Sequence, residues 1–133
     1  MAIETTLDSW RPRILSVLRI ATGLLLLQHG TAKYLGIPTV PMFADLQVTS
    51  LSGIAGIIEL VGGALFILGL FTRPTAFILS GLLAAAYFIA HAGRSFYPIL
   101  NGGELAVLYC FVFLYFVFSG PGPWSVDAAR NQA

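Results

Sequence analysis

The sequence predicts an all-α membrane protein, a four-transmembrane-helix bundle with a short interfacial helix between its first two helices. The chain of 133 residues is 57% hydrophobic and 10% charged, whereas an ordinary soluble domain carries about 25% charged residues. Its apolar residues form four segments, each near the ~20 residues that a helix needs to cross a bilayer. Within a single domain covering residues 1–133, we expect these helices at about 14–34, 52–71, 74–92 and 101–119.

The first segment, 14–34, follows Arg11 and Arg13 in the way that the apolar core of a signal peptide follows its charged start. It is too long for such a core, and its end, QHGTAK, lacks the small-residue pattern of a cleavage site. We therefore interpret it as the first membrane-spanning helix.

The connection at 36–51 is longer than two neighbouring antiparallel helices need, and loops of this length are often functional. Its PMFADLQ stretch places Met42, Phe43 and Leu46 at helical spacing behind a proline suited to a helix start. We expect a short interfacial helix here that serves as a lid. An irregular loop packed on the bundle is the alternative.

The second and third segments are joined so tightly by LFTRP that we expect antiparallel neighbours. Pro74 suits the first turn of the third helix, where its missing N–H costs nothing. Small residues recur at four-residue spacing in both segments, with Gly63 and Ala84 among them. Such spacing favours close helix packing in membranes, so we expect these two faces to touch.

The fourth segment opens at NGGE, which resembles a capping box with Asn101 as N-cap and Glu104 at the third helical position. The following run, YCFVFLYFVF, is bulky on every side, and we expect its phenylalanines to face lipid. The GPGPW stretch then ends the helix.

Basic residues near the helix ends predict the orientation. An even number of spans puts both termini on one side, and that side holds Arg11, Arg13, Arg73 and Arg130. The other side holds only Lys33 and Arg94. The positive-inside rule therefore places both termini in the cytoplasm.

Most ionisable residues of the four segments fall in the half of the bundle away from the termini, if each residue rises 1.5 Å along its helix. A charge at the centre of a spanning helix costs about 3 kcal/mol, so we expect these side chains to face one another. Glu59 is then expected to contact His29 and Lys33, and either His91 or Arg94. The whole group comprises His29, Lys33, Glu59, Tyr87, His91, Arg94 and Glu104.

Glu59 and His29 are the candidate catalytic residues, because both lie where water does not reach easily. The candidate ligand-binding residues are Lys33, His91, Arg94, Glu104 and Tyr87. Structural alternatives exist for several of them. Glu104 can cap a helix, His91 can be an interfacial histidine, and Lys33 and Arg94 can extend to the membrane surface.

Three further polar residues are expected to be structural: Arg19, Asp127 and Asn101. Arg19 lies deep in the half nearer the termini, where we expect it to bind either Asp127 or carbonyl groups near GPG. The single cysteine, Cys110, excludes an intrachain disulfide and a CxxC pair. No metal site is predicted, and a net charge of +1 gives no reason to expect a nucleic-acid partner.

Four sequence elements together resemble the DoxX family of small four-helix bacterial membrane proteins. They are R-x3-G-x5-HG-x2-K from Arg19 to Lys33, E-x2-GG-x5-GL-x-TR from Glu59 to Arg73, NGGE, and the terminal GPG followed by SVD. The resemblance covers nearly the whole chain and implies a helical bundle in the bacterial cytoplasmic (inner) membrane. It also implies a link to respiratory redox chemistry, because family members are associated with quinone-linked sulfur oxidation and with quinone or thiol stress.

The first functional prediction is accordingly a quinone-binding redox protein or subunit. His29, Lys33 and Arg94 would donate hydrogen bonds to the quinone, and Glu59 would relay protons. Electrons would come from a partner or a bound cofactor, because no group of the chain stores them.

The alternatives are a small proton-coupled transporter using Glu59, a non-catalytic assembly subunit, and a haem-binding protein with His29 and His91 as axial ligands. The expected partners are the lipid bilayer, a small-molecule ligand, and either a redox partner protein or further copies of this chain.

Overall fold

The structure is a computed structural model that describes residues 1–132. All regular structure in this part of the chain is helical, which confirms the predicted all-α class. The four long helices are α1 (Ala2–Tyr34), α2 (Leu51–Leu68), α3 (Thr72–Ala86) and α5 (Glu104–Ser119). The short elements are η1 (Pro41–Phe43), η2 (Tyr87–His91), η3 (Ala92–Arg94), α4 (Pro98–Asn101) and α6 (Val126–Ala129).

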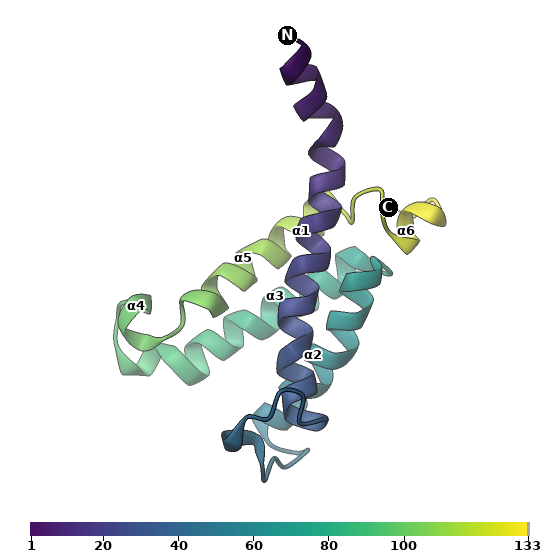
Figure 1. The fold of residues 1–133 in the computed structure, drawn as a ribbon. Helices are drawn as coiled ribbons and strands as arrows, with labels where there is room; N and C mark the ends of the chain where they lie inside the picture. Colours follow the sequence, from purple (N-terminus) through teal and green to yellow (C-terminus); the bar gives the residue numbers. More distant parts are fainter. Residues whose placement is uncertain (133) are drawn as a thin grey trace.

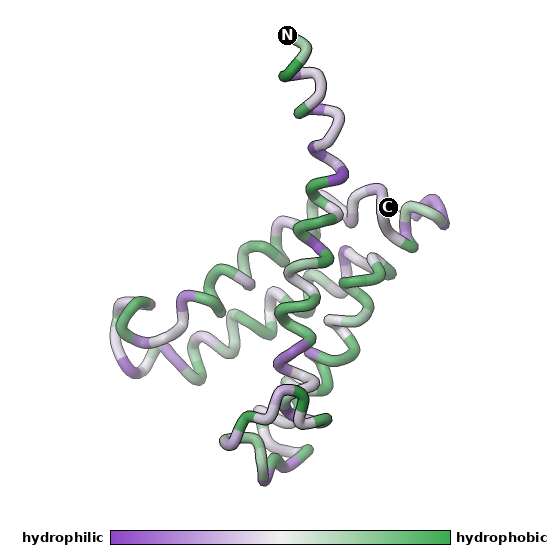
Figure 2. Tube along the Cα trace, in the orientation of Figure 1, coloured by the Kyte–Doolittle hydropathy of each residue, from purple (hydrophilic) through white to green (hydrophobic). Residues whose placement is uncertain are grey.

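Three helical stretches are long and apolar enough to cross a membrane: Ala2–Tyr34, Leu51–Leu68 and Thr72–Arg94. The fourth apolar helix, α5, has 16 residues and is shorter than expected. α1 is longer than its predicted span, because a more hydrophilic stretch precedes the apolar part and continues the same helix (Figure 2). This stretch projects beyond the rest of the molecule (Figure 1).

The long helices form two antiparallel pairs (Figure 1). α1 packs most extensively against α2, and α3 against α5, whereas α2 and α3 touch less. The two pairs meet near the short connection between α2 and α3, where α6 also lies, and their ribbons diverge away from it. The molecule therefore has one end where both pairs come together and another where they separate.

Glycines bring α1 and α2 into close contact. A Cβ atom added to Gly23 would lie 2.6 Å from Ile67 Cγ1, so no larger residue fits there without movement. Gly63 lies against α1 as well, with its added Cβ 3.3 Å from Leu27 Cα. The expectation that Gly63 faces α3 is therefore wrong. Small residues at four-residue spacing predict a close helix contact, but they do not identify the helix that makes it.

The core is aromatic where the two pairs meet. The Phe66 ring of α2 packs edge-to-face against Phe113 and Phe116 of α5, with centroid distances of 5.0 Å each. All three side chains are fully buried. The expectation that the α5 phenylalanines face lipid holds for the exposed Phe111 and Phe118 but is wrong for Phe113 and Phe116. A helix that is apolar on every side conceals which face points inward.

Arg19 joins the helix ends where the two pairs meet, and it is 1% exposed. It donates hydrogen bonds to four carbonyl oxygens, those of Phe66 and Ile67 near the end of α2 and those of Pro121 and Trp124 beyond α5. Pro121 and Trp124 belong to the GPG stretch and its continuation, so Arg19 binds the carbonyl groups near GPG, which were one of its two expected partners. The guanidinium group satisfies backbone acceptors that would otherwise be buried without a partner.

Asp127 completes this end of the molecule by capping α3. Its two carboxylate oxygens accept hydrogen bonds from the N–H groups of Phe71 and Thr72, both at 2.9 Å. Burial raises the pKa of the Asp127 carboxyl, but these hydrogen bonds and the charge of Arg130 together lower the pKa by more than burial raises it. The net result is a pKa below the usual range for aspartate.

Two predicted helix starts differ from the structure. The 36–51 connection contains only the single 3-10 turn η1 instead of a longer interfacial helix. Asn101 is the last residue of α4, and Gly103 is the N-cap of α5, which places Glu104 at the first helical position rather than the third. The capping box is absent because Gly102, with a φ of 74°, turns the chain between the two helices.

Candidate functional site

Glu59 lies inside α2 on the face that packs against α1, and its side chain is 7% exposed. Gly56, one turn before it, leaves room for the Lys33 side chain, whose Cδ would be 3.0 Å from an added Cβ. Lys33 Nζ then donates a hydrogen bond to Glu59 Oε1 at 2.5 Å. The result is an ion pair between two helices that is almost completely removed from solvent.

The long connection between α1 and α2 reaches this ion pair through Phe43. Lys33 Nζ lies 5.4 Å from the centre of the Phe43 ring, which belongs to η1. A cation near an aromatic ring gains electrostatic attraction, and more so where water is excluded. Nearby, the Tyr34 hydroxyl donates to the carbonyl of Gly53 at 2.5 Å and links the end of α1 to the start of α2.

His29 lies one turn before Lys33 but contacts α5. Its ring packs edge-on against Tyr109, with the centroids 6.5 Å apart. The Tyr109 ring in turn stacks on Phe113 at 5.8 Å. The Tyr109 hydroxyl is buried and has no hydrogen-bond partner among residues 1–132.

Tyr109 is not among the site residues predicted from the sequence. The sequence does not single it out, because the same helix carries a second tyrosine, Tyr115, and the missing hydrogen bond is visible only in the structure.

His91, Tyr87 and Asn101 form a second polar cluster on η2 and α4. His91 Nδ1 donates to the carbonyl oxygen of Asn101 at 3.1 Å, and Asn101 Nδ2 donates to the Tyr87 hydroxyl at 3.0 Å. Asn101 is fully buried and also donates to the carbonyl of Ser95 at 3.0 Å. The cluster fastens the turns that connect α3 to α5, and a π-helical turn supplies two of its members.

The predicted site residues are therefore divided between the two helix pairs. Among residues 1–132, the ion pair of Glu59 is with Lys33 alone, and neither His91 nor Arg94 joins it. Arg94 and Glu104 are exposed. Residue counting gives the depth of a side chain along its helix. It does not reveal that the end of α3 and the start of α5 lie away from α1 and α2 (Figure 1), although His29 still reaches Tyr109 of α5.

The two histidines do not share a site in this arrangement, because His29 lies against Tyr109 and His91 is bonded to Asn101. Within the described part of the chain, no group of three or more His, Cys, Asp and Glu side chains is arranged to hold a metal ion.

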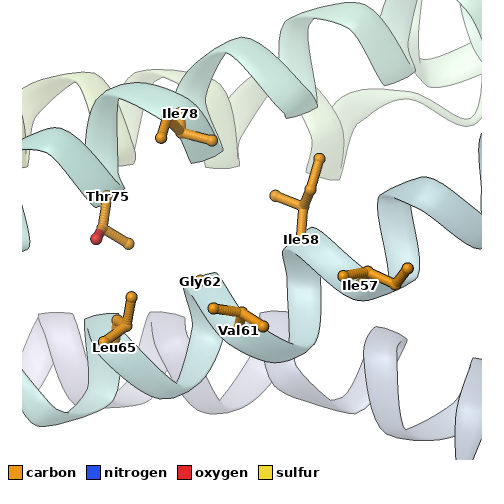
Figure 3. A pocket seen from close by; sticks show the side chains of 7 residues that line it. All are labelled: Ile57, Ile58, Val61, Gly62, Leu65, Thr75 and Ile78. Atoms are coloured by element: carbon orange, nitrogen blue, oxygen red, sulfur yellow. The ribbon is translucent and has the colours of Figure 1, made fainter.

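Two open grooves lie on the surface of the helices. One, of about 300 Å³, runs between α2 and α3 (Figure 3) and is lined by Ile57, Ile58, Val61, Gly62, Leu65, Thr75 and Ile78. The other, of about 550 Å³, lies along α5 and is lined by Pro98, Glu104, Leu105, Val107, Leu108 and Phe111. The groove between α2 and α3 has no charged side chain in its lining, so it suits lipid chains better than a polar ligand.

Comparison with known proteins agrees with the sequence motifs. The DoxX family model matches residues 14–92, which include both partners of the buried ion pair. The chain is 47% identical over 132 residues to an uncharacterized protein of Haemophilus influenzae, an alignment that covers 91% of this chain and 93% of that protein.

A second relative is an uncharacterized membrane protein of Mycobacterium tuberculosis, which is 30% identical over 148 residues. That alignment covers 86% of this chain and 80% of the relative. No solved structure matches the chain. With a family match over more than half of its length and apolar helices of membrane-spanning size, the chain is a membrane protein that belongs to the DoxX family.

Proposed function

We propose that this DoxX protein binds a quinone, or a small ligand with a similar carbonyl-bearing ring, beside Lys33 and Glu59. The observation that carries this proposal is the burial of their ion pair between apolar helices. A buried ion pair is rarely more stabilising than apolar side chains of the same volume. Its presence in a membrane protein therefore supports a role in binding, because intramembrane charges usually mark functional sites.

The chemistry of the pair fits such a ligand. The Lys33 ammonium group has three N–H donors, and its hydrogen bond to Glu59 uses one of them. Another can donate to a carbonyl oxygen of the ligand. Glu59 is placed to receive or supply a proton when the ligand changes its redox state. Reduction of a quinone takes two electrons and two protons, and a redox partner protein or bound cofactor would supply the electrons.

We also propose that the protein lies in the bacterial cytoplasmic membrane with both termini in the cytoplasm. Arg11, Arg13, Arg73 and Arg130 support this orientation, because all four belong to the terminal side. Trp10 and Trp124 pack edge-to-face at 6.5 Å on the same side, where indole rings favour the membrane surface. The Lys33–Glu59 pair then lies in the outer half of the membrane.

The orientation is tested by labelling single cysteines in a Cys110→Ala background. Cysteines at Thr39 and Ser95 should react with a membrane-impermeant maleimide added to intact cells. A cysteine at Ser125 should react only after permeabilisation. Labelling of Ser125 in intact cells would reverse the orientation.

The ligand is tested by purifying the protein in mild detergent and extracting bound quinone for identification by mass. We expect quinone in the wild type and in Glu4→Gln, a control that alters an exposed carboxylate near the start of α1. Lys33→Met should lose it, because the main donor is gone. If the wild type yields no quinone and binds none when a decyl-substituted benzoquinone is added, the proposal fails, and transport or assembly roles take its place.

A further inference from the structure

We infer that the hydroxyl group of Tyr109 is part of this ligand site and donates a hydrogen bond to a carbonyl oxygen of the bound ring. The inference rests on the proposed function and deepens it, because it adds a third helix, α5, to a site otherwise built on α1 and α2.

The unpaired hydroxyl of Tyr109 supports this role. Tyr109 is 4% exposed, and its hydroxyl has no hydrogen-bond partner among residues 1–132. Buried polar atoms are almost always hydrogen-bonded, and one left without a partner is destabilising. Phenylalanine would fill nearly the same volume without this cost, as it does at Phe113 and Phe116 on the same face of α5. The hydroxyl therefore calls for a partner from outside the described chain.

The position of the Tyr109 phenol also supports this role. The edge contact with His29 places Tyr109 against α1, one turn of helix from Lys33. Stacking on Phe113, with an angle of 14° between the ring planes, fixes the direction of its ring. Side chains of three helices thus converge on one region, although their ribbons diverge in Figure 1.

The donors, the carboxylate and the aromatic rings of this region together match one kind of ligand. Lys33 and Tyr109 can both donate a hydrogen bond, Glu59 can exchange a proton, and the His29, Tyr109 and Phe113 rings supply flat apolar surface. A ligand that matches them has a flat ring and at least one strong acceptor oxygen. This combination describes a quinone head group, and it excludes a pure hydrocarbon, which would leave both donors unpaired.

The test compares the wild type, Tyr109→Phe and Tyr115→Phe. Tyr115 lies on the same helix and is 59% exposed, so the removal of its hydroxyl serves as a control. Each purified protein is titrated with a decyl-substituted benzoquinone and, separately, with the carbonyl-free decyl-substituted dimethoxybenzene. The Tm without ligand is measured for all three. We expect Tyr109→Phe to bind the quinone about tenfold more weakly, as for the loss of one hydrogen bond. It should keep its affinity for the carbonyl-free probe, and its Tm without ligand should be at least that of the wild type, because an unpaired buried hydroxyl has been removed. Tyr115→Phe should match the wild type throughout.

The outcomes separate the two proposals. If the wild type binds no quinone, the proposed function fails and takes this inference with it. If Tyr109→Phe binds the quinone as tightly as the wild type does, the inference alone fails. It also fails if Tyr109→Phe loses affinity equally for both probes, because the hydroxyl would then serve the fold and not the ligand carbonyl.

Discussion

The two ends of the molecule hold buried charge in different ways. Where the helix pairs meet, Arg19 and Asp127 are bonded to backbone groups at helix ends and loops. Where the pairs separate, Lys33 and Glu59 are bonded to each other and keep further hydrogen-bonding capacity. A charge whose bonds are all made to the backbone holds the fold together. A charge with capacity to spare is the better candidate for binding a ligand.

The largest expected effect is at Arg19. Arg19→Met leaves four buried or partly buried carbonyl oxygens without their donor, and we expect a loss of about 3 kcal/mol or more in the free energy of unfolding. Arg19→Lys should restore little of it, because an ammonium group cannot reproduce the planar fork of the guanidinium. Thermal unfolding in detergent checks both. Wild-type stability of Arg19→Met would remove the distinction between the two ends.

The next effect concerns the ion pair. Lys33→Met and Glu59→Leu should each destabilise the protein by about 2–3 kcal/mol, because each leaves a buried polar partner unpaired. The double variant should be milder than the sum of the two, because neither partner then remains alone. Glu59→Gln should fold and retain its shape but lose proton-linked activity. Strictly additive losses of stability would show that the two residues do not act as a pair.

A smaller effect is expected in the aromatic core. Phe113→Leu should lower the free energy of unfolding by about 1 kcal/mol, because it disturbs a fully buried ring packed against Phe66. Phe111→Leu is the matched control on the same helix, and since its ring is exposed it should have almost no effect. Equal Tm values for the two variants would contradict the inward orientation of Phe113.

The smallest effect is the pH dependence at Asp127. Its pKa is lower in the folded protein than the usual value, so the carboxylate stabilises the fold above the unfolded pKa of about 3.9. That contribution is lost as the pH falls through the folded pKa. Tm measured between pH 7 and pH 3 should fall less for Asp127→Asn than for the wild type, from a lower starting value. Parallel curves would assign the acid sensitivity to other groups.

How much could be predicted from the sequence differs between these regions. The ion pair of Lys33 and Glu59 follows from the cost of placing charges in lipid, which forces them to find each other. The depth of His91 and Arg94 along their helix is equally predictable. Their separation from Glu59 is not, because it depends on the angle between the two helix pairs, which the sequence pattern does not indicate. Tyr109 escapes sequence reasoning for a related reason, because its significance is a missing hydrogen bond.

The inward face of α5 is also unpredictable from the pattern, since Phe113 and Phe111 look alike in an apolar run. The expected contact of Arg19 with carbonyls near GPG could be anticipated, because a cation in the apolar part of a helix has few other partners. The sequence therefore predicts which residues need partners better than it predicts where the helices bring them together.

The short length of α5 has a consequence for the surrounding lipid. At 1.5 Å per residue its 16 residues extend about 24 Å, less than the roughly 30 Å of a typical hydrocarbon core, whereas the apolar part of α1, at 14–34, extends about 30 Å. A helix shorter than the bilayer is accommodated when the acyl chains beside it compress. We therefore expect the membrane to be thinner beside α5 than beside α1. This hydrophobic mismatch should make the protein most stable in vesicles of short-chain lipids.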